Sequence, residues 1–104
     1  MTDKELLELA AKAIGLTLRY NYLGGRDANQ PWDPLEDDGD ALRLAVELKM
    51  TVTIDDSAYT FAEAALFNEA VFVDAIERHE KSDPYAATRR AIVRAAAEIG
   101  RNVK

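Results

Sequence analysis

Three arginines near the C-terminal end of the chain have the spacing of one helix face. Arg90, Arg94 and Arg101 fall within a sector of about 40° when successive residues are placed 100° apart around a helix axis. The planar guanidinium group, with its several N–H donors, suits the oxygens of phosphate and carboxylate groups. The spacing therefore predicts a surface that binds an anionic ligand or partner. A solvated helix face is the structural alternative, because arginine is a good helix former and is favoured near helix C-termini.

An acidic cluster in the first half of the chain raises a metal hypothesis. Its members are Asp33, Glu36, Asp37, Asp38 and Asp40. Hard cations take several oxygen ligands, and counting from Glu36 even places Glu47 at the twelfth position of a calcium loop. However, the sixth position is Ala41, where such a loop requires glycine. Capping of the following helix and its positive dipole end explain the same carboxylates, so no metal site is predicted.

Trp32 and His79 could each have a functional role or a purely structural one. Trp32 lies between Pro31 and Pro34 and could stack on a ligand or anchor a partner. Closure of the core is the favoured interpretation, because tryptophan is highly buried on average. His79 is the only histidine, and its acidic sequence neighbours on an exposed turn would rarely make an acid–base pair. No catalytic constellation is therefore predicted.

Length and composition indicate one domain, residues 1–104, that is soluble and intracellular. The chain has no cysteine, which rules out disulfides and thiolate chemistry, and its sequence shows no signal peptide or membrane-spanning apolar run. The net charge of −6 divides into −6 over residues 1–56, −3 over 57–82 and +3 over 83–104. General binding to duplex nucleic acid is disfavoured, because it requires a basic surface that neutralises several phosphates. A basic patch at the C-terminal end is compatible with these charges.

Apolar periodicity and breaker residues predict three helices, over residues 3–14, about 41–48 and 84–100. Thr2 or Asp3 can cap the first helix, and Gly15 ends it. Asp37 or Asp38 can cap the second. These signals are local and do not depend on tertiary packing.

The second and third helices have wide or alanine-rich apolar faces. In the second helix the apolar sector predicts burial on more than one side; it contains Ala41, Leu42, Leu44, Ala45 and Leu48. In the third helix Pro84 takes the first position after a cap at Ser82 or Asp83. The predicted apolar face of this helix comprises Tyr85, Thr88, Ile92, Ala95, Ala96, Ile99 and Val103. Its small residues would let it lie close against a sheet or another helix.

Alternation of apolar and polar residues predicts strands at 17–22 and 50–54, with a surface loop over 24–31 between them. Residues 58–80 are ambiguous. A third strand around 70–76, preceded by an irregular or short helical link, is preferred over a continuous helix from Thr60 to Glu80. The predicted fold is therefore α+β, a small mixed β-sheet of about three strands covered by helices on both faces, in the order α-β-α-β-β-α.

Two segments resemble small proteins encoded by tailed phages and prophages. They are Trp32-Asp33-Pro34, which leads into the acidic helix start, and the Ala/Arg helix from Ala86 to Ala96. The order of elements is similar to that of the phage ABA sandwich domain family, in which helices cover both faces of a small sheet. The resemblance implies that fold and a phage origin. It supplies no catalytic residues, because the family has no assigned activity.

Together these features lead us to expect a phage accessory protein in the host cytoplasm. It would be a non-enzymatic binding module without a cofactor, acting on a host protein or a small anionic ligand through Arg90, Arg94, Arg101 and Trp32. The alternative is a small metal-assisted hydrolase or nucleotide-processing enzyme that uses the carboxylates of residues 33–40. No contact with a membrane is expected. A homo-oligomer is left open, because alanine-rich helices can build oligomers as readily as cores.

Overall fold

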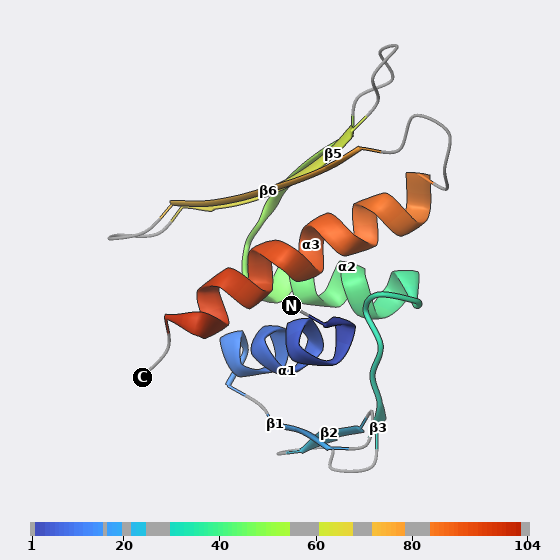
Figure 1. Ribbon diagram of the computed structural model, residues 1–104, viewed down its shortest axis with the longest axis vertical. Helices are drawn as coiled ribbons and strands as arrows, with labels where there is room; N and C mark the ends of the chain where they lie inside the picture. The colour runs from blue at the N-terminus through green and yellow to red at the C-terminus, as the bar shows by residue number, and fades with distance from the viewer. Residues whose placement is uncertain are drawn as a thin grey trace.

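Three helices form the centre of the protein (Figure 1). The computed structural model describes residues 2–15, 17–19, 22–24, 30–54, 61–67, 72–78 and 84–102. The helices are α1 (Asp3–Ala13), α2 (Asp38–Glu47) and α3 (Pro84–Arg101). All three were predicted, although α2 begins a turn earlier than expected. None of the helices in these ranges is long and apolar enough to cross a membrane.

The described strands form two separate antiparallel sheets. One contains β1 (Thr17–Arg19), β2 (Tyr22–Gly24) and the two-residue β3 (Gln30–Pro31), in that order. The other contains β4 (Thr51–Ile54), β5 (Phe61–Phe67) and β6 (Phe72–Arg78), also in that order. In the second sheet Ala64 lies opposite Val52 on one side and opposite Ala75 on the other, which sets the register of all three strands.

The predicted fold class is wrong. The chain does not build a single mixed sheet with helices on both faces; the described pairings are all antiparallel and fall into two sheets. The layers are inverted relative to the prediction, because the helices lie between the sheets (Figure 1): β5 and β6 pack on α3, and β1 packs on α1. The buried apolar side chains that are described belong to the helices and to residues 32–35. The compact body is therefore mostly helical, unlike the arrangement that the phage resemblance implies.

A second correction concerns residues 58–80. The strand predicted around 70–76 is confirmed as β6, but the segment before it, expected to be an irregular or short helical link, is strand β5. The alternative of a continuous helix from Thr60 to Glu80 is therefore wrong. The Ala- and Glu-rich composition of β5 favours a helix locally. Pairing with β4 on one edge and β6 on the other overrides that weak preference. His79 and the proposed caps Ser82 and Asp83 lie outside the described residues.

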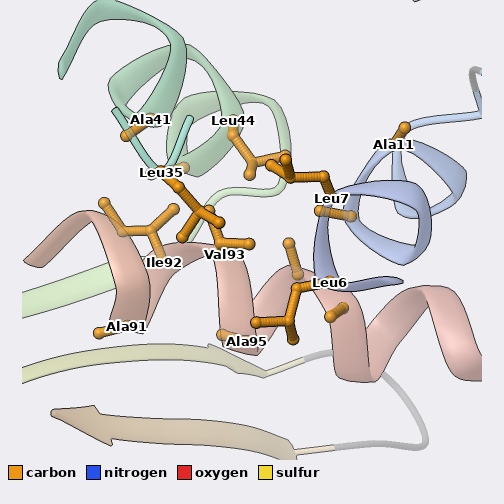
Figure 2. Close-up of a cluster of buried hydrophobic side chains, with 14 of the residues drawn as sticks. Leu6, Leu7, Ala11, Leu35, Ala41, Leu44, Ala91, Ile92, Val93 and Ala95 are labelled. Carbon is orange, nitrogen blue, oxygen red and sulfur yellow. The ribbon is translucent and has the colours of Figure 1, made fainter. Parts of the chain in front are cut away.

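Helix α3 is the central element, in contact with α1, α2, β5 and β6. Its buried residues surround most of the helix axis; they are Ala87, Ala91, Ile92, Val93, Ala95, Ala96, Ala97 and Gly100. Figure 2 shows Ile92 and Val93 pointing toward Leu35 and Leu44, with Leu6 of α1 beside the α3 turn that carries Ala95. The sequence predicted one apolar face and placed Tyr85 in it, yet Tyr85 is 68% exposed. Helix α3 is buried over more of its circumference than predicted because α1 and α2 pack against it as well as β5 and β6.

Helix α2 is buried on one side only. Its inner face consists of Ala41, Leu44 and Ala45, which are all at least nine-tenths buried. Leu42 and Val46 on the opposite face are exposed by 64% and 66%. The predicted burial of α2 on more than one side is therefore wrong for the chain as a single copy.

Small residues bring α1 and α3 into close backbone contact. Ala10 and Ala11 of α1 and Ala95 and Ala96 of α3 are fully buried. A Cβ atom added at Gly100 would lie 1.8 Å from the carbonyl oxygen of Leu9, a distance that no real side chain tolerates. Glycine at this position is therefore required by the spacing of the two helices and not by an unusual backbone conformation.

We expect Gly100→Ala to lower the free energy of unfolding by at least about 1–3 kcal/mol, because the added methyl group must push α1 away from α3. Urea unfolding followed by circular dichroism measures the change. Gly39→Ala in α2 is the matched control, since its Cβ would come no closer than 3.2 Å to side-chain atoms of Arg43 and Asp37. Equal effects of the two substitutions would contradict the close contact.

Candidate functional site

The acidic segment that precedes α2 is a hydrogen-bonded helix cap. Asp37 is the N-cap residue of α2, and its Oδ2 accepts the backbone N–H of Asp40 at 2.7 Å. The prediction that Asp37 or Asp38 caps this helix is thus confirmed for Asp37. Oδ1 of Asp33 accepts the backbone N–H of Leu35 at 3.2 Å, which tightens the turn before the cap.

Asp40 is the buried member of this segment, with a relative exposure of 7%. Its Oδ2 accepts the backbone N–H of Asp33 at 2.9 Å, and its Oδ1 accepts from Nη2 of Arg43 at 3.2 Å. The sequence predicted only a favourable charge near the helix dipole. The structure shows in addition that the carboxylate joins the first turn of α2 to the chain beside Trp32. A buried carboxylate is tolerated here because both oxygens have donors.

Arg89 connects α3 to this acidic segment before α2, a role that the sequence did not predict. Its Nε donates to the backbone oxygen of Leu35 at 2.8 Å, and its Nη1 contacts Oδ1 of Asp38 at 2.5 Å. Its side chain is only 13% exposed, whereas that of Asp38 is 69% exposed. The available signal was its position on the helical wheel, at the edge of the apolar face and apart from the other arginines.

The carboxylates of Asp33, Asp37, Asp38 and Asp40, here termed the acidic network, all accept hydrogen bonds from groups of this chain. No group of three or more potential metal-ligating side chains is gathered anywhere in the described ranges. What this arrangement does chemically is to satisfy the free N–H groups at the start of α2 and to hold α3 beside them. Four of the five carboxylates that the enzyme alternative would use therefore hold the fold, and the fifth, Glu36, is exposed.

The three predicted arginines do share one exposed face of α3, here termed the arginine strip (Arg90, Arg94 and Arg101). Nη2 of Arg90 contacts both carboxylate oxygens of Asp3 in α1, at 3.1 and 3.3 Å. Nη1 of Arg101 lies 2.9 Å from Oε1 of Glu98, three residues earlier on the same helix. The Arg90 and Arg101 side chains remain 40% and 54% exposed, and Arg94 is exposed. The strip is thus accessible, with acidic neighbours at both ends.

Trp32 does not share that surface. It is 5% exposed and belongs to the hydrophobic core together with Leu35. Pro34 is one of the largest fully buried residues described. The interpretation of Trp32 as closure of the core is the one that the structure supports, and of the predicted binding residues only the three arginines lie together.

We expect Trp32→Ala to cost about 3–5 kcal/mol of unfolding free energy, because it removes a large buried side chain and leaves a cavity. Denaturant unfolding of the variant measures this loss. Tyr85→Ala is the control, since it removes an aromatic ring that is 68% exposed, and a much smaller loss is expected. A small effect of Trp32→Ala on stability would place the indole outside the core.

Asp40→Ala should lower stability by about 1–3 kcal/mol, because it leaves the N–H of Asp33 without its acceptor. Thermal and urea unfolding test this value. Glu36→Ala removes an exposed carboxylate from the same turn and should change stability by less than about 0.5 kcal/mol. If the two variants were equally stable, the buried network would not hold the helix start.

Comparisons of this chain with protein-family models, with curated proteins and with solved structures find no match. In the described ranges, the acidic network is committed to structure, and the arginine strip offers accessible charged donors on a rigid helix. The strip is accordingly the candidate functional site.

Proposed function

We propose that the protein is a non-enzymatic binding module whose arginine strip recognises an acidic surface of another protein. The observation that carries the proposal is the placement of Arg90, Arg94 and Arg101 on the one face of α3 that the core does not cover. Helix α3 is held on its other sides, so the guanidinium groups extend from a fixed backbone. A fixed backbone lowers the entropy lost when such side chains bind.

The length of the strip favours an extended partner over a small anion. Arg90 and Arg101 are eleven residues apart, which corresponds to about 16 Å along a helix. Arg90 and Arg94 are one turn apart, about 6 Å, which one phosphate or carboxylate group can bridge. A single small anion would therefore use only these two residues. A row of carboxylates on a protein surface would use all three.

The existing ion pairs of the strip do not prevent binding. Exposed pairs such as Arg90–Asp3 and Arg101–Glu98 contribute only about 0–1 kcal/mol, so carboxylates of a partner can replace Asp3 or Glu98 at little cost. The charge of residues 83–104 is +3 while that of the whole chain is −6. An acidic partner is thus attracted to this end of the molecule and repelled elsewhere, which gives orientation to the encounter.

The biological setting is part of the same proposal. The resemblance of residues 32–34 and 86–96 to small phage and prophage proteins favours an accessory protein that acts in the host cytoplasm on a host protein. The binding chemistry of the strip stands without it.

We expect Arg90→Glu/Arg94→Glu to weaken binding of a twelve-residue oligoglutamate peptide at least tenfold, because two donors become repulsive charges. Titration calorimetry at low salt measures the affinity, which should fall as salt screens the charges. The melting temperature should change little, since both side chains are at least partly exposed. Capture of a host protein from infected-cell lysate should be lost in parallel.

Lys4→Glu/Lys12→Glu is the matched control, because it changes the net charge equally at exposed positions of α1. Equal weakening by both double variants would show that net charge alone decides binding. Inorganic phosphate in place of the peptide tests the small-anion alternative. Binding of phosphate that depends on Arg90 and Arg94 but not on Arg101 would favour a small ligand over a protein.

A further inference from the structure

The outer face of α2 carries apolar side chains that the core leaves uncovered. Leu42 and Val46 are spaced one turn apart and are exposed by 64% and 66%. Leu44, on the opposite side of the helix, is 1% exposed. Of the described residues, the exposed large hydrophobic ones are these two and Tyr85 of α3. At this one-turn spacing the two aliphatic side chains are neighbours on the surface of the helix.

Charged residues of opposite sign stand at the two ends of this face. Asp38 lies one turn before Leu42, at the same four-residue spacing; its Oδ1 contacts Arg89 of α3, but its side chain remains 69% exposed. Lys49 is exposed and follows the C-terminal end of the helix, three residues after Val46. Along one flank, Glu47 and Arg43 are also exposed and one turn apart, although Arg43 donates to Asp40 within its own chain. From the N-terminal to the C-terminal end of this face, the side chains are therefore acidic, apolar, apolar and basic.

We propose that the outer face of α2 is a homodimer interface in which two copies of α2 pack antiparallel about a two-fold axis. A two-fold axis brings each residue of one helix opposite a different residue of the other. Leu42 then meets Val46 of the second copy, and Asp38 lies beside Lys49 of the second copy. The Arg43 and Glu47 flank is self-complementary in the same way. The second copy is the occupant because Asp38 and Arg43 of one copy would each lie beside a residue of opposite charge, Lys49 or Glu47, in the other.

A parallel arrangement would not have this complementarity. It would place Asp38 next to Asp38 and Lys49 next to Lys49, and like charges that face each other oppose pairing. A parallel arrangement would also place the two helix dipoles side by side in the same direction, where they repel, whereas antiparallel dipoles attract. The charge pattern therefore selects both the occupant and its direction.

The size of the face sets the strength of the dimer. Helix α2 has 10 residues, which is about 15 Å of helix length, so the contact belongs among the small interfaces. We therefore expect a reversible dimer whose population rises with concentration. The interface does not include the arginine strip on α3, so it can form whether or not the strip binds a partner.

Sedimentation velocity over a range from micromolar to millimolar protein tests the dimer. The wild-type chain should shift from monomer toward dimer, whereas Leu42→Glu/Val46→Glu should remain monomeric at every concentration. The same variant should keep the wild-type melting temperature at low concentration, because both positions are exposed in the monomer. A wild-type chain that stays monomeric at millimolar concentration, or a dimer that survives the double substitution, would overturn the proposal.

Two further variants test the direction of packing. Glu47→Arg should weaken the dimer by placing an arginine opposite Arg43 of the second copy, and Glu47→Gln should weaken it less because it adds no like charge. The chain has no cysteine, so Leu42→Cys/Val46→Cys adds the only thiols. Oxidation should join position 42 to position 46 of the other copy. The covalent dimer is isolated by non-reducing electrophoresis before trypsin separates the two positions by cutting after Arg43. Cross-links of 42 to 42 and 46 to 46 instead would overturn the antiparallel arrangement.

The arginine variant Arg90→Glu/Arg94→Glu separates this proposal from the proposed binding function. It should lose binding of the acidic peptide and keep the wild-type dimer population. Loss of the dimer in that variant would show that α3, not α2, holds the two copies together and would overturn the α2 interface.

Discussion

The close backbone contact between α1 and α3 is the constraint on which the rest of the structure depends. It is set by Gly100 against the carbonyl of Leu9 and by fully buried alanines on both helices. With α1 and α2 on one side of α3 and β5 and β6 against it as well, almost the whole circumference of α3 is covered. The face left over is the arginine strip. The same packing that buries the helix therefore determines which of its charges can meet a partner.

The acidic network is the second feature that organises the fold. Its carboxylates hold α2 and α3 in place. Asp37 caps α2, Asp40 holds the chain beside Trp32, and Arg89 ties Asp38 and the carbonyl of Leu35 to α3. These bonds fix how α2 is rotated about its own axis. That rotation places Leu44 in the core and leaves Leu42 and Val46 outside. A cluster that looks like a metal site in the sequence thus determines a surface elsewhere on the helix.

The two proposed surfaces differ in what drives association. The arginine strip offers charge over a long row, which suits an acidic partner and is sensitive to salt. The outer face of α2 offers a small apolar centre between opposite charges, which suits a second copy of the chain. A dimer would present two arginine strips at once. Two strips on one particle raise the effective concentration for a partner with repeated acidic sites.

The sequence by itself determined what depends on neighbouring residues: the three helices, a cap at Asp37 or Asp38, the end of α1 at Gly15, and the common face of Arg90, Arg94 and Arg101. Only the tertiary structure decided that the helices lie between the sheets and that the Ala-rich segment 61–67 is a strand, because its pairing partners are distant in sequence. It also decided that Arg89 connects α3 to the segment before α2, whereas Arg90 stays partly exposed. Likewise, only the tertiary structure shows that Leu42 faces outward. Periodicity assigns residues to a face of a helix, but which face meets the core depends on elements that pack from elsewhere in the chain.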